Sequence, residues 1–224
     1  MLTQFVDSFI DMVAWNAQYL CGPREFIYYP RPPACSVQDI TRNQIAESFH
    51  GDWLLQLDSD HQFEPDLLAR LLSMAKHTGA DVVVGMYQFK AHPHSPVLYR
   101  RLEDGFYPLV EWDTRATAMI VDSAGGGCLW AKRSVYDRIK TELNEKPFTR
   151  YEELSEDHSF FLRLRKLDIQ VVCAPRVECH HLQVKPVTLA DYDRPWINSV
   201  RQVDSKVMRG GESAVSEPVG VAAG

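Results

Sequence analysis

The sequence has no hydrophobic run long enough to cross a membrane, since none approaches the roughly 18 apolar residues that a spanning helix needs. Residues 1–20 carry Asp7 and Asp11 but no lysine or arginine, so they lack the basic start of a signal peptide. Basic residues are in the minority, with 24 Lys and Arg against 30 Asp and Glu. The net charge of −6 argues against a broad nucleic-acid-binding surface, and any polyanionic ligand will need local positive charge.

The cysteines offer no C-x-x-C pair. The five of them form an odd set, and three lie in apolar stretches where a free thiol packs as a small hydrophobic side chain. This usage fits a reducing compartment, and we expect a soluble, cytoplasmic protein.

The length and composition favour one folded domain. The chain has 224 residues, of which 45% are hydrophobic and 24% charged, which is enough for one α/β domain with a substantial core. From about residue 205 onward small residues prevail and the apolar periodicity is lost. We therefore expect a domain over residues 1–204 and a disordered tail over residues 205–224.

Hydrophobic periodicity predicts helices and strands in alternation along the N-terminal half. The segments are helices at 3–20, 37–49 and 64–79, and strands at 24–30, 53–57 and 81–87. Pro65 near the start and Gly79 just after the end mark the third helix. This alternation is typical of an α/β fold with a mainly parallel sheet flanked by helices.

The C-terminal half begins with a different pattern. Prolines and charges break residues 88–122 into short segments, which predicts a small antiparallel ribbon over one end of the sheet. A glycine turn, a short strand and a helix follow it. A helix at 155–167 then leads into extended chain over residues 169–182.

The strand at 53–57 ends in two acids, Asp58 and Asp60. If strand geometry persists that far, alternation points both side chains to one side. The carboxyl ends of strands in an open α/β sheet are where ligands bind, and Mg²⁺ or Mn²⁺ relieves the repulsion between two carboxylates. Taken alone, a D-x-D of this kind is more often a polar loop after a strand.

Two further polar pairs follow. Glu156 and Asp157 come after Ser155, a good N-cap, and lie in the first helical turn, where acids are as common for stability as for catalysis. His180 and His181 end the extended segment and could supply one imidazole to a metal. By itself, a histidine pair is more often a surface or core feature.

The last two features are weaker signals. The run Gly125, Gly126 and Gly127 lacks both phosphate-loop patterns, so it serves either the close approach of a ligand or a flexible turn. Arg42 and Asn43 lie early on a helix and face either an anionic ligand or water.

Taken in order, these motifs resemble those of GT-A fold glycosyltransferases, in particular the family 2-like group. The resemblance covers roughly residues 36–182 through TRNQIAESFHGDWLLQLDSDHQFEPDLLARLL, SAGGGCLWAKRSVYDRI and EDHSFFLRLRKLDIQVVCAPRVECHHL. Within these segments, the D-x-D, G-G-G, E-D and H-H elements are each weak alone, but the four in the expected order are specific. The resemblance implies a Rossmann-like sheet and a metal-dependent enzyme that moves a sugar from a UDP-, GDP- or dTDP-sugar to an unknown acceptor hydroxyl.

The resemblance also implies a nucleotide and metal site. Asp58 would lie near the ribose and the metal, and Asp60 would bind Mn²⁺ or Mg²⁺ directly. His181 would complete the metal site, with His180 as the open alternative.

The remaining implied roles concern chemistry and substrate binding. Asp157 resembles the general base of an inverting transfer, with Glu156 beside it. The glycine turn would shape the sugar and acceptor pocket, and Arg42 with Asn43 would lie close to the nucleotide.

Two departures from the family pattern stand out. Members usually begin with an apolar strand ending in Pro-Thr, whereas Met1 leads almost directly into the first helix, so this strand is missing from the expected sheet. The true start lies upstream, another segment fills the gap, or nucleotide binding is impaired. Asp168 stands where the family often has a glycine in a left-handed turn, at a cost of about 1 kcal/mol or less.

Two other functions remain as alternatives. A degenerate transferase-like module would bind a nucleotide-sugar without turnover. A D-x-D phosphatase of the haloacid dehalogenase type fits less well, because Gln62 stands where those enzymes have Thr or Val. The sequence leaves open the donor, the acceptor, inverting or retaining stereochemistry, and the oligomeric state.

Overall fold

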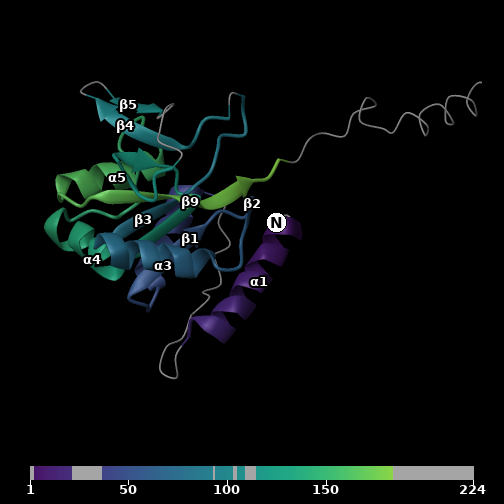
Figure 1. Cartoon of the computed structure of the whole chain (residues 1–224). Coiled ribbons are helices and arrows are strands. Elements are labelled where there is room, and N and C mark those ends of the chain that lie inside the picture. The colour runs from purple at the N-terminus through teal and green to yellow at the C-terminus, as the bar shows by residue number, and fades with distance from the viewer. Residues whose placement is uncertain (1–2, 22–36, 93, 103–104, 109–114, 184–224) are drawn as a thin grey trace, which may run out of the picture. The chain divides into compact units, whose positions relative to one another are not determined.

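The computed structural model describes residues 3–21, 37–92, 94–102, 105–108 and 115–183 (Figure 1). The strand expected at 24–30 and the tail expected at 205–224 lie outside these residues, and so does the end of the expected domain. The described elements belong to one unit, Met1–Gln183.

The described elements alternate as the sequence predicts. In chain order they are α1 (Thr3–Tyr19), α2 (Gln38–Ser48), β1 (Trp53–Leu57), β2 (His61–Phe63), α3 (Leu67–Thr78), β3 (Val82–Met86), β4 (Leu98–Leu102), β5 (Gly105–Pro108), β6 (Met119–Val121), β7 (Ser123–Ala124), β8 (Cys128–Lys132), α4 (Arg133–Glu142), α5 (Glu156–Lys166) and β9 (Val171–His181). The helices expected at 3–20, 37–49, 64–79 and 155–167 are confirmed within one to three residues at each end.

The main sheet has the strand order β1-β8-β3-β9-β2, and β6 pairs with β9 beside this path. β1, β3 and β9 run in the same direction, because β8 is antiparallel to both β1 and β3 while β3 and β9 are parallel. The α/β sheet flanked by helices is thus confirmed, and it is mixed. β8 runs backwards because it starts from the glycine turn at the carboxyl end of β1, where the Asp58 amide donates to the Gly127 carbonyl.

A second, three-stranded sheet has the order β5-β4-β7, with antiparallel pairing. It confirms the antiparallel ribbon expected within residues 88–122. Figure 1 shows this ribbon above one end of the main sheet, on the side where α5 lies.

Helices cover both faces of the main sheet, and β3 shows why. Val82 and Val84 face a core formed with α2, α4 and α5, whereas Val83 between them faces a core formed with α1 and α3. All three valines are fully buried. Because both faces of this central strand are covered, every position along it is apolar. The carboxyl ends of β1, β3 and β9 consequently meet at one edge of the sheet, where the polar residues following them gather.

Asp168, just past α5, adopts the left-handed backbone conformation that its family position implies, with a φ of 54°. Because glycine adopts this conformation without a steric cost, Asp168→Gly should raise the free energy of unfolding by up to about 1 kcal/mol. Urea denaturation measures the difference. Gln170→Gly, at an exposed neighbouring position without a positive φ, should instead lower it by about 0.5 kcal/mol. A loss of stability in both variants would contradict the expectation.

Candidate functional site

Arg42 is the buried centre of the site. Its guanidinium donates to Asp58 Oδ1 at 2.8 Å, to Gln56 Oε1 at 3.0 Å and to the Gly126 carbonyl at 3.0 Å. Its Nε lies 3.6 Å from Glu156 Oε1. Burial lowers the pKa of Arg42, but the nearby carboxylates raise it further, so the net pKa lies above the ordinary value and the group stays charged.

The three glycines are required by close approach of the protein's own side chains. A Cβ atom would stand 1.8 Å from Tyr87 Oη at Gly125, 2.9 Å from Arg42 Cζ at Gly126 and 2.3 Å from His61 Cε1 at Gly127. These distances are shorter than any Cβ contact allows. The turn is therefore packed against side chains of the site. The sequence analysis expected either the close approach of a ligand or a flexible turn, and did not anticipate this packing. Contact between the turn and an acceptor stays a proposal.

Asp58 and Asp60 have different partners, and the condition for the expected strand alternation is not met. β1 ends at Leu57 and the chain turns at once, so strand alternation does not extend over the motif. Asp58 bonds to Arg42, whereas Asp60 Oδ2 lies 2.6 Å from Lys90 Nζ and 3.4 Å from His181 Nε2.

The Asp60 carboxylate is kept ionised by its surroundings. Burial raises its pKa, but the hydrogen bond and charge of Lys90, together with His181 and His61, lower it below the ordinary value. Lys90 follows β3 and was missed by the sequence analysis, because nothing in the sequence shows that the chain after β3 returns to the D-x-D turn.

His61 is a second residue that the sequence analysis missed. It is fully buried on β2, its ring lies 4.8 Å from that of His181, and Tyr87 packs against it at 4.6 Å. Its Nδ1 lies 3.0 Å from the Gly127 carbonyl. Burial lowers the pKa of His61, which favours the neutral imidazole. The only signal in the sequence is its place directly after Asp60.

Asp60, His61 and His181 form the group of described residues that could hold a metal ion. Each offers one ligand atom, and the three atoms lie within 4.8 Å of one another. Asp58 is outside this group. His180 points elsewhere, since strand alternation places it 63% exposed with Nε2 4.0 Å from Glu178.

Asp157 lies at the start of α5. Ser155 caps this helix as predicted, accepting from the His158 amide at 3.4 Å. Asp157 Oδ1 accepts from the Ser155 hydroxyl and, at 2.8 Å, from the His158 amide. Asp157 is half-buried and raises the pKa of both Arg42 and Tyr87, so its charge acts within the same site.

The match with a known family covers most of this site. Residues 38–167, more than half of the chain, match the model for glycosyl transferase family 2. The chain belongs to this family. The matched span begins at α2 and ends just after α5, so it includes Arg42, the D-x-D turn, the glycine turn and Asp157, but not His181.

Among the solved structures similar to this family 2 chain, two match it at low identity. One is A197 from STIV, with 18% identity, a TM-score of 0.47 and coverage of 80% of this chain and 89% of that one. The other is an apo UDP-glucose pyrophosphorylase, with 9% identity, a TM-score of 0.41 and coverage of 66% and 55%. Both likenesses are too distant to carry an argument about activity. No curated protein matches the chain.

Two of the expected site residues of this family 2 chain, Glu156 and Asn43, make structural contacts between α2 and the chain around the start of α5. Glu156 is buried, with its carboxylate oxygens 3.6 Å from Arg42 and 3.7 Å from Arg150. Asn43 accepts from the amide of residue 148 at 2.9 Å and donates to the hydroxyl of residue 149 at 3.4 Å. Both side chains thus fix the chain before α5 relative to α2.

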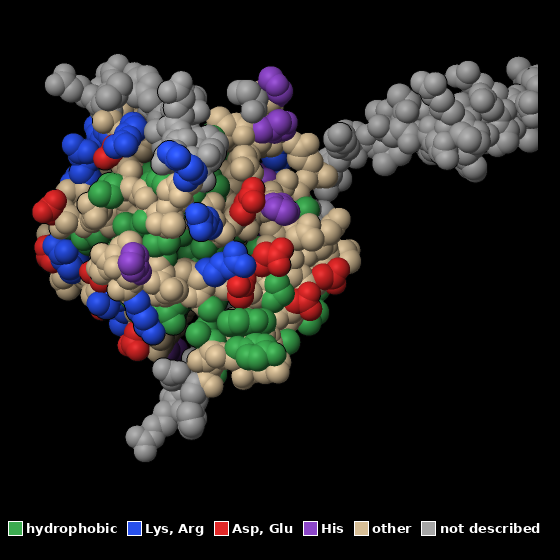
Figure 2. Space-filling view, viewed as in Figure 1, with side chains coloured by type: hydrophobic (Ala, Val, Ile, Leu, Met, Phe, Trp, Pro, Cys, Tyr) green, Lys and Arg blue, Asp and Glu red, His purple; other side chains and the backbone are tan. Residues whose placement is uncertain are grey.

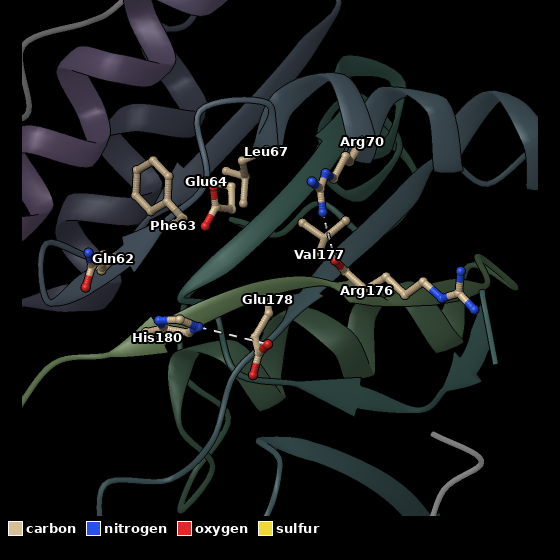
Figure 3. A pocket seen from close by; sticks show the side chains of 9 residues that line it. All are labelled: Gln62, Phe63, Glu64, Leu67, Arg70, Arg176, Val177, Glu178 and His180. Atoms are coloured by element: carbon tan, nitrogen blue, oxygen red, sulfur yellow. Dashed lines mark hydrogen bonds and ion pairs between the residues drawn. The ribbon is translucent and has the colours of Figure 1, made fainter. Parts of the chain in front are cut away.

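The surface of the described residues adds two observations. On the face that Figure 2 shows, basic side chains are more frequent at the upper left and acidic ones at the right. A hollow of about 190 Å³ lies on the outer side of β2 and β9, where Gln62 and His180 alternate with the inward-facing His61 and His181 (Figure 3). It is therefore separate from the candidate site.

Among the described helices, none combines the length and hydrophobicity needed to cross a bilayer.

Removing the central charge tests the site's architecture. Arg42→Met would leave the buried Glu156 with only the longer Arg150 contact, and should lower the free energy of unfolding by about 3 kcal/mol. Arg70→Met, which breaks an exposed ion pair with Asp66, is the control and should cost less than about 1 kcal/mol. Urea denaturation compares the two. Adding Glu156→Gln to Arg42→Met should restore part of the loss, and equal losses in the two single variants would contradict the assignment.

Proposed function

We propose that this family 2 glycosyltransferase transfers a sugar from a nucleoside-diphosphate sugar to an acceptor hydroxyl, with Mn²⁺ or Mg²⁺ and inversion at the sugar. The observation that carries the proposal is the convergence of metal-ligating side chains, the Arg42–Asp58 pair and Asp157 at the carboxyl edge of the sheet. These elements match the donor, metal and base functions that the reaction requires.

The residues present fit a divalent cation. Asp60 is ionised, and His181 donates from Nδ1 to the Gln88 carbonyl at 2.9 Å, which leaves its Nε2 free to coordinate. Asp60 and His181 would hold the ion. A bound cation would offset the charge that develops on the departing diphosphate.

Donor recognition is assigned to Asp58. Its carboxylate is 35% exposed and held by Arg42, so it can accept hydrogen bonds from ribose hydroxyls without moving. Arg42 keeps this carboxylate in place and does not itself need to reach the ligand.

Proton removal from the acceptor hydroxyl is assigned to Asp157. Of the two neighbouring acids, Glu156 is engaged by two arginines, whereas Asp157 has one oxygen bonded to the helix cap and a second available. Deprotonation of the attacking hydroxyl increases its nucleophilicity as it displaces the diphosphate. We place this reaction in the cytoplasm, where the buried free thiols of Cys128, Cys173 and Cys179 stay reduced.

Isothermal titration with UDP-, GDP- and dTDP-sugars, each with Mn²⁺ and again with EDTA, tests donor binding. Cation-dependent binding of one nucleotide class is the expected result, and it selects the donor for an acceptor screen that monitors nucleoside diphosphate release. Binding without release across the screen would favour the alternative of a nucleotide-sugar-binding module. No binding by folded protein would contradict the proposal.

Asp157→Asn separates chemistry from binding. Loss of the base should lower kcat by about 10²–10⁴-fold while the Kd for the donor stays unchanged, because the amide preserves the size of the side chain. Glu153→Gln, which removes an exposed carboxylate four residues earlier, is the control and should retain the wild-type kcat. If Asp157→Asn turns over at the wild-type rate, another group takes the proton.

A further inference from the structure

We propose that His61 is the third protein ligand of the cation, so that two imidazoles and one carboxylate bind it before any nucleotide and select Mn²⁺ over Mg²⁺. This inference rests on the proposed metal dependence and adds a ligand outside the D-x-D motif. It follows from the pairing of β2 with β9, which brings His61 and His181 directly opposite each other. Opposite residues of an antiparallel pair project from the same face, as the ring separation of 4.8 Å shows.

Both imidazoles are fixed in the same tautomer. A carbonyl only accepts hydrogen bonds, so Nδ1 of His61 donates to Gly127 and Nδ1 of His181 donates to Gln88. In its metal-binding, neutral form each ring then presents the lone pair of Nε2. Backbone carbonyls that orient histidines in this way are characteristic supports of metal ligands.

His61 Nε2 has no hydrogen-bond partner among the described residues although it is buried. An unsatisfied buried polar atom costs about 1–3 kcal/mol, so a histidine serving only to fill the core would be a poor choice here. The neighbouring turn even requires glycine at position 127 to accommodate the ring. A cation at the group formed with Asp60 and His181 would satisfy this nitrogen.

The donor set determines which ion is preferred. Mg²⁺ takes oxygen ligands and retains several waters, whereas imidazole suits first-row transition ions. With Asp60 as the single carboxylate and Lys90 beside it, the site offers Mg²⁺ little negative charge. Three protein ligands already lie together, so Mn²⁺ should bind to the protein alone.

The test is a Mn²⁺ titration of the full chain without nucleotide, followed by the electron paramagnetic resonance of free Mn²⁺. We expect wild-type protein to bind Mn²⁺ and a hundredfold excess of Mg²⁺ to leave it bound. His61→Asn retains a donor at the position of Nδ1 and removes Nε2, and should weaken binding at least about 10-fold. His181→Asn should do the same, whereas His180→Asn, the exposed neighbour, should bind like wild type.

A spectroscopic readout keeps the inference testable if His61→Asn fails to fold. Electron spin echo modulation of Mn²⁺-loaded wild-type protein should reveal two coupled imidazole nitrogens, and one or none would overturn the proposal. Absence of Mn²⁺ binding by wild type, displacement by Mg²⁺, or wild-type affinity in folded His61→Asn would also overturn it. If the protein transfers sugar but shows neither Mn²⁺ binding nor two coupled imidazole nitrogens, this inference fails and the proposed function stands. If it shows both but transfers no sugar, the metal site stands and the proposed function fails.

Discussion

A buried positive charge on Arg42 is the constraint on which the rest of the site depends. A guanidinium removed from water must be paired and hydrogen-bonded, and here its partners come from four separate segments: β1, the D-x-D turn, the glycine turn and α5. Each partner is thereby fixed in position relative to α2. Arg42 therefore links these four segments through one buried side chain.

The glycine turn links Arg42 to His61. Its carbonyls accept from Arg42 at Gly126 and from His61 at Gly127, while the Gly127 amide donates to Tyr87. These contacts need the backbone closer to the side chains than any Cβ would permit. The same turn sends β8 back through the sheet between β1 and β3. The antiparallel direction of β8 and the geometry of the site therefore have one common cause.

Local signals in the sequence predicted the elements well, and contacts between distant segments account for what was missed. The leucine spacing with Pro65 and Gly79 located α3, and Ser155 located the start of α5, because caps and amphipathic faces are local. The pairing of the three-residue β2 with the end of β9 has no local signal, so His61 was overlooked. β1 likewise ends at Leu57, so strand alternation could not be used to place Asp58 and Asp60, which have different partners.

The charged side chains of the site carry a net negative charge. Its cationic side chains, Arg42, Lys90 and Arg150, are each already beside a carboxylate, and the acids Asp58, Asp60, Glu156 and Asp157 outnumber them. A nucleoside diphosphate would bring further negative charge to this edge of a chain whose net charge is −6. Coulomb repulsion at such short range is severe in a partly buried site, so tight donor binding requires positive charge from outside the protein. Under the proposed function, His61 and His181 would hold a divalent cation that attracts the diphosphate, a role that further arginines could not take because a guanidinium does not coordinate a metal.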